Sequence, residues 1–231
     1  MTKPLISLLV FLAWTNNFVI SARAQLSLPP ASPADLEETY KISIEHRVAD
    51  ILAQLKLTDQ SKAGKVHDLI IDQYHVLRAR DAAIDAELKT ATNSSPPADR
   101  AKLFQAKTKP LHDQFLAKLS AELSPDQVEC VKDRMTYDKV KVTFDAYCAI
   151  VPNLTEQDKA QILTVLKDAR DEAIDGGSAK EKSDIFQKYK DRINAYLDAH
   201  GHSVAKAYLD WQAKQDAAKK TAEAAPAAPK P

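Results

Sequence analysis

Five side chains that suit ligand binding lie in the second half of the sequence. The candidate ligand-binding residues are Tyr137, Asp138, Tyr147, Arg170 and Arg192. A tyrosine presents an apolar ring with a polar edge, and an arginine can bind a carboxylate through two parallel hydrogen bonds. These residues indicate a site for a sugar or a carboxylate. The alternative is that the tyrosines are core residues with satisfied hydroxyl groups, and no catalytic residue can be assigned.

The six histidines do not have the spacing of a metal-binding motif. His67 and His75 could share a helix face, but no H-E-x-x-H pattern accompanies them. His200 and His202 flank a predicted helix end, where a histidine often interacts with the terminal carbonyl groups. The sequence also lacks a P-loop, a G-x-G-x-x-G motif and a G-x-S-x-G motif. We therefore expect no metal ion and no cofactor.

Cys130 and Cys148 are the only cysteines, and two interpretations of them stay open. A disulfide would close a loop of roughly 18 residues and stabilise the fold by about 3 kcal/mol. Two separate buried thiols are the alternative. A redox or metal role is not indicated, because no C-x-x-C pair is present.

Residues 1–24 have the pattern of a cleaved signal peptide. Lys3 supplies positive charge, residues 5–13 form the apolar segment, and an Ala-Arg-Ala sequence precedes the expected cleavage site. We predict export to the periplasm or the medium with cleavage after Ala24, followed by an extended lead at residues 25–33. Two asparagines interrupt the apolar run, so no transmembrane anchor is expected.

The charge of the sequence is balanced, with 32 basic and 32 acidic residues. Proteins that bind nucleic acids or anionic membranes usually carry a strong positive excess. We therefore expect no nucleic-acid partner.

The clearest structural signal is an antiparallel helical hairpin over residues 155–201. Thr155 is a suitable N-cap for its first helix, and Ser178 followed by Glu181 predicts a capping box for the second. Gly176 is predicted to end the first helix in the left-handed conformation. Apolar residues return every three or four positions in both helices, including Ile162, Leu163, Val165, Leu166, Ala169, Ile174, Ile185, Phe186, Tyr189, Ile193 and Leu197.

The same periodicity over residues 34–218 predicts a single all-α domain. Four glycines in the whole chain argue against strands joined by tight turns. We expect a bundle of about six to seven helices built on antiparallel hairpins. Residues 219–231 are rich in alanine, proline and lysine and are predicted to be a disordered tail.

Three segments of this bundle are predicted to depart from regular helices. The second helix, at about 59–90, would be on the order of 45 Å long, so part of it should project from the bundle or bend. Pro110 predicts a kink or a break at Lys109 in the third helix. Residues 136–143 are expected to be irregular, with a brief helix following at 144–151.

Three predicted helix starts share a short pattern: Leu57-Thr58-Asp59-Gln60, Leu123-Ser124-Pro125-Asp126-Gln127 and Leu154-Thr155-Glu156-Gln157. The pattern resembles the Leu-Thr-x-x-Gln motif of periplasmic stress chaperones, which are small exported helical proteins that shield unfolded clients. Only Gln127 occupies the matching position, with Ser124 in place of threonine. An apolar residue followed by a good N-cap explains the pattern equally well.

Several segments resemble the domain-of-unknown-function family 3826. They are Leu119 to Val128, Met135 to Tyr137, Pro152 to Thr155, and the stretch from Asp168 through Leu197. The likeness extends from about Ala34 to Trp211. It implies an exported bacterial protein of uncharacterised activity and provides no catalytic residues.

Two hypotheses about function follow from these observations. The first is a non-enzymatic binding or interaction module of the bacterial envelope or secretome, with polysaccharide or unfolded protein as its partner. The second is a carbohydrate-active enzyme or accessory protein that acts on polysaccharide. A concave pocket lined by residues around 137–147 and 170–192 would favour the second, and an exposed apolar groove would favour a chaperone.

Overall fold

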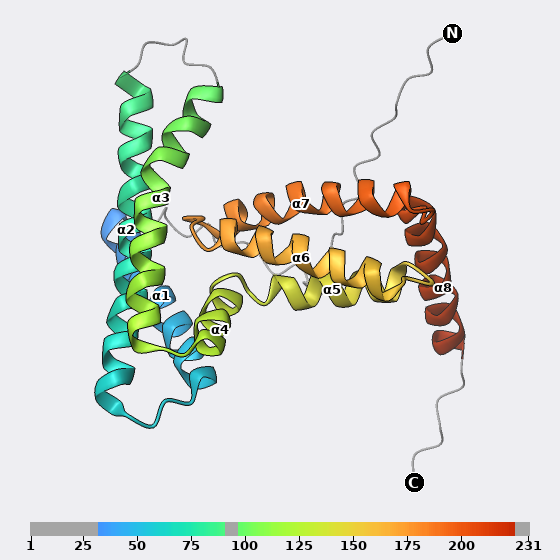
Figure 1. Ribbon diagram of the computed structural model, residues 1–231, viewed down its shortest axis with the longest axis horizontal. Coiled ribbons are helices and arrows are strands. Elements are labelled where there is room, and N and C mark those ends of the chain that lie inside the picture. Colours follow the sequence, from blue (N-terminus) through green and yellow to red (C-terminus); the bar gives the residue numbers. More distant parts are fainter. Residues whose placement is uncertain (1–31, 91–96, 225–231) are drawn as a thin grey trace, which may run out of the picture.

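The computed structural model describes residues 32–90 and 97–224, and the regular structure within them is entirely helical (Figure 1). The helices are α1 (Pro33–Leu55), α2 (Gln60–Thr90), α3 (Pro97–Glu122), α4 (Pro125–Met135), α5 (Lys139–Ile150), α6 (Glu156–Ala173), α7 (Ala179–Ala199) and α8 (Val204–Ala224). The all-α prediction is confirmed, with eight helices in the described ranges where six to seven were expected. The predicted signal peptide at 1–24 lies outside these ranges.

The helices form two bundles, each around its own hydrophobic core. The first bundle consists of α1 to α4 and buries residues such as Val48, Ile70 and Leu119. The second consists of α5 to α8, extends sideways from the first (Figure 1), and buries residues such as Leu166 and Phe186. The segment predicted as one domain, at 34–218, contains both cores.

Reciprocal side-chain caps begin three of these helices, and those of α4 and α6 lie at helix starts predicted from the sequence. Ser32 Oγ accepts a hydrogen bond from the Asp35 amide at 3.1 Å, and the Asp35 carboxylate accepts one from the Ser32 amide at 3.0 Å. The same reciprocal pattern begins α4 and α6. A cap of this kind contributes about 1 kcal/mol, because it satisfies amides that the helix itself leaves unpaired.

The predicted hairpin is present as α6 and α7, but the expected left-handed conformation of Gly176 is wrong. Gly201 is the one glycine with positive φ in the described residues, at 88°. Gly176 is required for a different reason. A Cβ atom there would be 2.9 Å from Cγ of Lys182 and 3.3 Å from the carbonyl oxygen of Ala173. The position needs space rather than backbone freedom.

The capping box predicted for α7 forms only in part. Ser178 Oγ accepts a hydrogen bond from the Glu181 amide at 3.1 Å, as predicted. The Glu181 carboxylate, however, accepts from the Gly177 amide at 2.9 Å. This contact folds the loop between α6 and α7 back onto the first turn of α7.

The segment between α4 and α5 is shorter than predicted. Only residues 136–138 link the two helices, and the prediction of irregular structure up to 143 is wrong because α5 begins at Lys139. Residues at positions 140, 143 and 147 face inward at helical spacing, which accounts for the earlier start. Tyr137 and Asp138 both have positive φ, at 60° and 53°.

Three other predictions concern α2, α3 and α8. Figure 1 shows α2 and the start of α3 projecting past the α6–α7 hairpin, as expected for part of the long helix. The predicted break at Lys109 does not occur, since α3 continues through Pro110. The last helix, α8, runs to Ala224 and so into the predicted tail at 219–231.

Candidate functional site

The tip of the α6–α7 hairpin, residues 174–182, lies against the first bundle (Figure 1). Ile174 is fully buried and belongs to the first core, whereas its neighbour Ala173 belongs to the second. Gly177 lies directly against α2, where a Cβ atom would be 1.8 Å from Oδ2 of Asp81. The tip therefore connects the two bundles, and a side chain at residue 177 would displace the Asp81 carboxylate.

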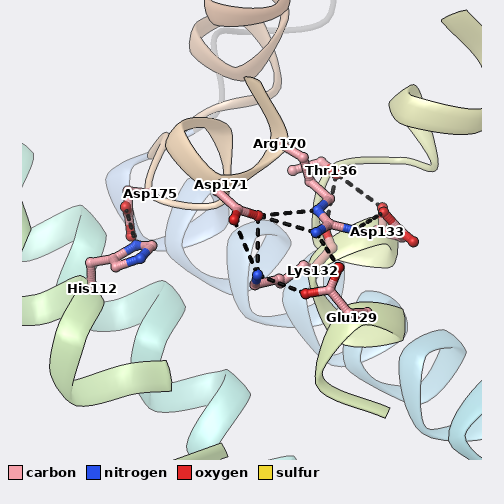
Figure 2. Close-up of polar contacts among 8 residues, drawn as sticks. All are labelled: His112, Glu129, Lys132, Asp133, Thr136, Arg170, Asp171 and Asp175. Carbon is pink, nitrogen blue, oxygen red and sulfur yellow. Dashed lines mark hydrogen bonds and ion pairs between the residues drawn. The ribbon is translucent and has the colours of Figure 1, made fainter. Parts of the chain in front are cut away.

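Asp175 of the tip binds His112 of α3. Nδ1 of His112 lies 2.7 Å from Oδ2 of Asp175 (Figure 2), and the Asp175 side chain is only 6% exposed. This hydrogen bond raises the pKa of His112 above its ordinary value of 6.5, although burial opposes the rise. The other carboxylate oxygen of Asp175 is buried and has no hydrogen-bond partner within the described residues. The site thus pairs a readily protonated imidazole with a buried carboxylate.

Arg170 of α6 is the centre of a second group of charges, which joins α6 to α4 (Figure 2). Its guanidinium, 3% exposed, binds the carboxylates of Glu129, Asp133 and Asp171, at 2.7 Å in the case of Asp133. Lys132 binds Glu129 at 2.8 Å and Asp171 at 3.1 Å. Burial raises the pKa of Glu129, but the hydrogen bonds from Lys132 and Arg170 outweigh it and hold that pKa below its usual value. These five residues form the Arg170 cluster.

Lys182, the last residue of the tip, is a buried cation. Its side chain lies within the protein at 1% exposure, and its Nζ donates to the carbonyl oxygens of Met135 at 2.9 Å and Ile174 at 3.4 Å. Burial lowers the pKa of Lys182 to about 8, and the nearby Arg47 adds to this effect. Lys182 therefore ties the ends of α4 and α6 to the start of α7.

A groove of about 720 Å³ lies between α3 and the hairpin. Its walls consist of Phe104, Gln105, Thr108, Lys109, His112 and Asp113 of α3, and of Asp171, Glu172, Asp175, Glu181 and Lys188 of the hairpin. All of these except Phe104 carry a polar or charged group. Two of its ion pairs lie within one wall: Lys109 with Asp113 at 2.7 Å, and Lys188 with Glu172 at 3.3 Å. We consider this groove, with the His112–Asp175 pair in it, the candidate functional site.

Arg80 of α2 supports the α3 wall of the groove from behind. Its guanidinium lies 4.4 Å from the centre of the Phe104 ring and donates to Oγ1 of Thr108 at 3.1 Å. It also binds Asp81 at 2.8 Å. The wall is therefore held in place by a buried cation rather than by apolar packing alone.

The residues proposed from sequence lie in several places instead of one pocket. Arg170 is at the centre of the Arg170 cluster, next to the groove through Asp171. Tyr147 is buried in the second core, and its hydroxyl donates to Oδ1 of Asn194 at 2.7 Å. Arg192 lies 4.9 Å from the centre of the Tyr189 ring.

The remaining two proposed residues lie at the link between α4 and α5. Tyr137 is exposed, with the Arg47 guanidinium 5.2 Å from its ring centre. Asp138 pairs with Arg134 and lines a shallower groove of about 350 Å³. The interactions described for the five proposed residues do not join any two of them directly.

Both cysteines are free thiols, so the disulfide alternative is not realised in the structure. Cys130 is half-buried on α4 and Cys148 is exposed on α5. Burial raises the pKa of the Cys130 thiol, which makes it less reactive.

Neither the His112–Asp175 pair of the candidate site nor the adjacent Lys182 was singled out in the sequence as a site residue. Asp175 directly precedes the two glycines of the hairpin loop. Two adjacent glycines could have indicated that the loop approaches another element closely at this point. The partner of Asp175 is 63 positions away, on another helix, and local spacing carries no information about it.

Comparison with known proteins provides a family but no activity. A family model described as "Protein of unknown function (DUF3826)" matches residues 41–217. None of the curated proteins compared with the chain matches it. Within residues 32–90 and 97–224, no helix is long and apolar enough to cross a membrane, and no group of three or more potential ligands could hold a metal ion.

Proposed function

The chain belongs to the DUF3826 family of proteins of unknown function, and from this premise we propose that it is an exported, non-enzymatic binding module. Its ligand is a hydroxyl-rich saccharide held in the groove between α3 and the α6–α7 hairpin. Export is proposed from the signal-peptide pattern of residues 1–24. The location would be the periplasm or the medium of a bacterium.

One observation carries the proposal: the groove combines the polar groups that a saccharide needs with an aromatic side chain. Carboxylates such as Glu172 and Glu181 can accept hydrogen bonds from sugar hydroxyls, while Gln105 and Lys188 can donate. Phe104 offers an apolar surface in the same groove. Ligand pockets commonly occur where two packed units meet, and their volumes are roughly 300–1,000 Å³.

The composition of the groove also favours a saccharide over an unfolded protein. A chaperone surface needs exposed apolar area, because an unfolded client is recognised by its apolar side chains. Phe104 is the one apolar residue of the walls, and the rest of the groove's apolar surface comes from the carbon atoms of polar side chains. We therefore rank the chaperone hypothesis below the saccharide hypothesis.

A thermal-shift screen of the purified protein tests the proposal. The panel contains neutral, acidic and amino oligosaccharides, each at several concentrations. A ligand at about tenfold its Kd stabilises the folded state by about 1.4 kcal/mol, which raises Tm by about 3–6 °C for a chain of this size. If no oligosaccharide raises Tm at millimolar concentration, the proposal is wrong.

A matched pair of variants locates the binding. Gln105 and Gln212 are both exposed glutamines on helices, and only Gln105 lines the groove. Gln105→Ala should weaken the Tm response at least severalfold, because it removes both a donor and an acceptor from the wall. Gln212→Ala should leave the response unchanged. Equal responses from the two variants would place the saccharide elsewhere.

The His112–Asp175 pair favours one alternative, a carbohydrate-active enzyme in the same groove. A histidine oriented by a carboxylate can transfer protons, and general acid–base catalysis of this kind contributes about 10²–10⁴-fold in rate. The test is the appearance of new reducing ends when the protein is incubated with each oligosaccharide that binds. Turnover would establish an enzyme, and its absence with every bound saccharide would contradict this alternative.

A further inference from the structure

A short segment of the hairpin forms part of the groove and is fixed at both of its ends. Ile174 precedes it and is fully buried in the first core, while Lys182 follows it and donates to the carbonyl oxygen of Met135. Between them, residues 175–181 include the two adjacent glycines and the N-cap Ser178. This segment contributes Asp175 and Glu181 to the walls of the groove.

One polar contact and one close approach join this segment to the first bundle. Asp175 binds His112 of α3 at 2.7 Å, and Gly177 lies against the carboxylate of Asp81. The side chains that an anchored loop would use for apolar packing are absent, since the segment consists of Asp, Gly, Gly, Ser, Ala, Lys and Glu. Segments with few buried apolar contacts open at low free-energy cost.

Burial of the Asp175 carboxylate costs free energy even when the segment is docked. Its side chain is 6% exposed, and one of its oxygens lacks a hydrogen-bond partner in the described part of the chain. A buried carboxylate of this kind costs free energy that its hydrogen bond to His112 and the nearby charge of Lys182 must offset. If His112 becomes neutral, the charge-assisted hydrogen bond weakens by roughly half, and water competes better for the carboxylate.

We propose that residues 175–181 are a latch, and that the His112–Asp175 pair holds this latch in its docked position. When docked, the segment completes the groove, and when released, it removes part of the hairpin wall. The inference rests on the proposed function, because it describes how binding in this same groove is regulated. A docked latch binds the saccharide, and a released latch does not.

Other charges around His112 set the direction of the response. The charged groups that line the groove with it are Lys109 and Asp113 on α3, Asp171 and Glu172 on α6, and Glu181 and Lys188 on α7, while Arg80 and Asp81 of α2 support the wall. The hydrogen bond to Asp175 raises the pKa of His112, as do the charges of Asp175, Asp113 and Asp171. Because the docked state binds the proton more tightly, docking is favoured at pH 6.5 and below. It weakens as the pH rises through the raised pKa.

Hydrogen exchange of the backbone amides tests the latch without any ligand. The measurement compares the peptide covering 175–181 at pH 6 and pH 9, after correction for the intrinsic exchange rate. We expect protection of this peptide to fall by about fivefold at pH 9. The peptide covering 123–128 is the control, because it holds a similar N-cap with Ser124 and Gln127 and contains no histidine. Equal changes in both peptides would overturn the proposal.

His112→Gln distinguishes the effect of the His112–Asp175 pair from a general effect of pH. Glutamine cannot carry a charge, so the variant should show the low protection of the wild-type segment at both pH values. If His112→Gln keeps the full pH 6 protection of the wild type, the His112–Asp175 pair does not hold the segment in place.

A covalent clamp provides the complementary test. Asp81→Cys with Gly177→Cys, in a Cys130→Ser/Cys148→Ser background, places two sulfurs where the Asp81 carboxylate meets the Gly177 backbone. The oxidised clamp should hold protection of 175–181 constant from pH 6 to pH 9, and reduction should restore the pH dependence. A clamped segment that still loses protection contradicts the latch.

Binding measurements then distinguish this inference from the proposed function. The probe is the oligosaccharide with the largest Tm shift in the panel. A wild-type affinity that falls from pH 6 to pH 9, with a constant affinity for the oxidised clamp, supports both. Binding that is equal at the two pH values keeps the proposed function and overturns the latch. No binding at any pH overturns the proposed function, while the exchange experiment still decides the latch.

Discussion

Two groups of charges flank the hairpin tip and differ in how permanently they hold it. On one side, Arg170 binds three carboxylates, and its guanidinium keeps its charge at every pH that a protein encounters. On the other side, His112 binds the single carboxylate of Asp175, and its charge changes near neutral pH. The first group can serve as a fixed joint between the bundles, and the second as a conditional contact. The predictions below test this difference.

The largest effect is expected from Arg170→Met. The substitution keeps the volume but leaves the carboxylates of Glu129, Asp133 and Asp171 with Lys132 as the remaining cation of the Arg170 cluster. Breaking a fully buried ion pair costs about 3–5 kcal/mol, and these carboxylates are partly exposed, so we expect a loss of about 2–4 kcal/mol. Urea unfolding measures the change. A loss under about 1 kcal/mol would remove the contrast between the two groups.

Lys180→Met is the matched control for that substitution. Lys180 pairs with Asp184 four positions later on α7, and both side chains are more than half exposed. Exposed pairs of this type contribute little to stability. The unfolding midpoint of this variant should therefore equal that of the wild type.

The next effect compares two glycines. Gly177→Ala would place a methyl group 1.8 Å from Oδ2 of Asp81, whose carboxylate is held by Arg80. We expect a loss of about 1–3 kcal/mol, the usual cost of an overpacked contact. Gly64 lies within α2 with nothing within 4 Å of its Cβ position, so Gly64→Ala should stabilise by about 0.5–1 kcal/mol. Changes of the same sign would show that Gly177 is not a point of close approach.

How much of this arrangement could be predicted depended on distance along the chain. The cap formed by Ser124 and Gln127 joins residues three apart, so the sequence predicted it. The pairs Asp133–Arg170 and His112–Asp175 join residues 37 and 63 apart, and charged residues on a helix surface are too common to be matched by type alone. Arg170 was proposed as a ligand-binding residue, but its donors are occupied by carboxylates of the protein itself.

A smaller effect, in which stability increases with pH, is expected for Lys182. Burial lowers its pKa to about 8 in the folded protein, against 10.5 in an unfolded chain. The folded state therefore binds the proton less tightly, and wild-type stability attributable to Lys182 should increase as the pH rises from about 8 to 10.5. The difference in unfolding free energy between the wild type and Lys182→Met should grow over this range by about 1–2 kcal/mol. A constant difference would mean that burial does not lower the pKa of Lys182.

The smallest effect, and the sharpest test of the comparison, is the pH dependence of His112→Gln. The raised pKa of His112 means that its stabilisation is complete below pH 6.5 and is lost as the pH rises through that pKa. We expect a cost of about 1 kcal/mol at pH 6 and almost none at pH 9, because His112 is partly exposed. His67→Gln is the control, since His67 also has a raised pKa from hydrogen bonds to Asp68 and Glu45, but both of those carboxylates are exposed.

The dependence on ionic strength distinguishes the contributions of these two histidines most clearly. Exposed ion pairs are screened at high ionic strength, whereas a pair with a buried carboxylate is screened much less. At pH 6, the small cost of His67→Gln should disappear when the ionic strength is raised to 1 M, and the cost of His112→Gln should persist. If both costs disappear together, Asp175 is accessible to solvent in the folded state, and the contact with His112 is an ordinary surface pair that could not control the hairpin segment.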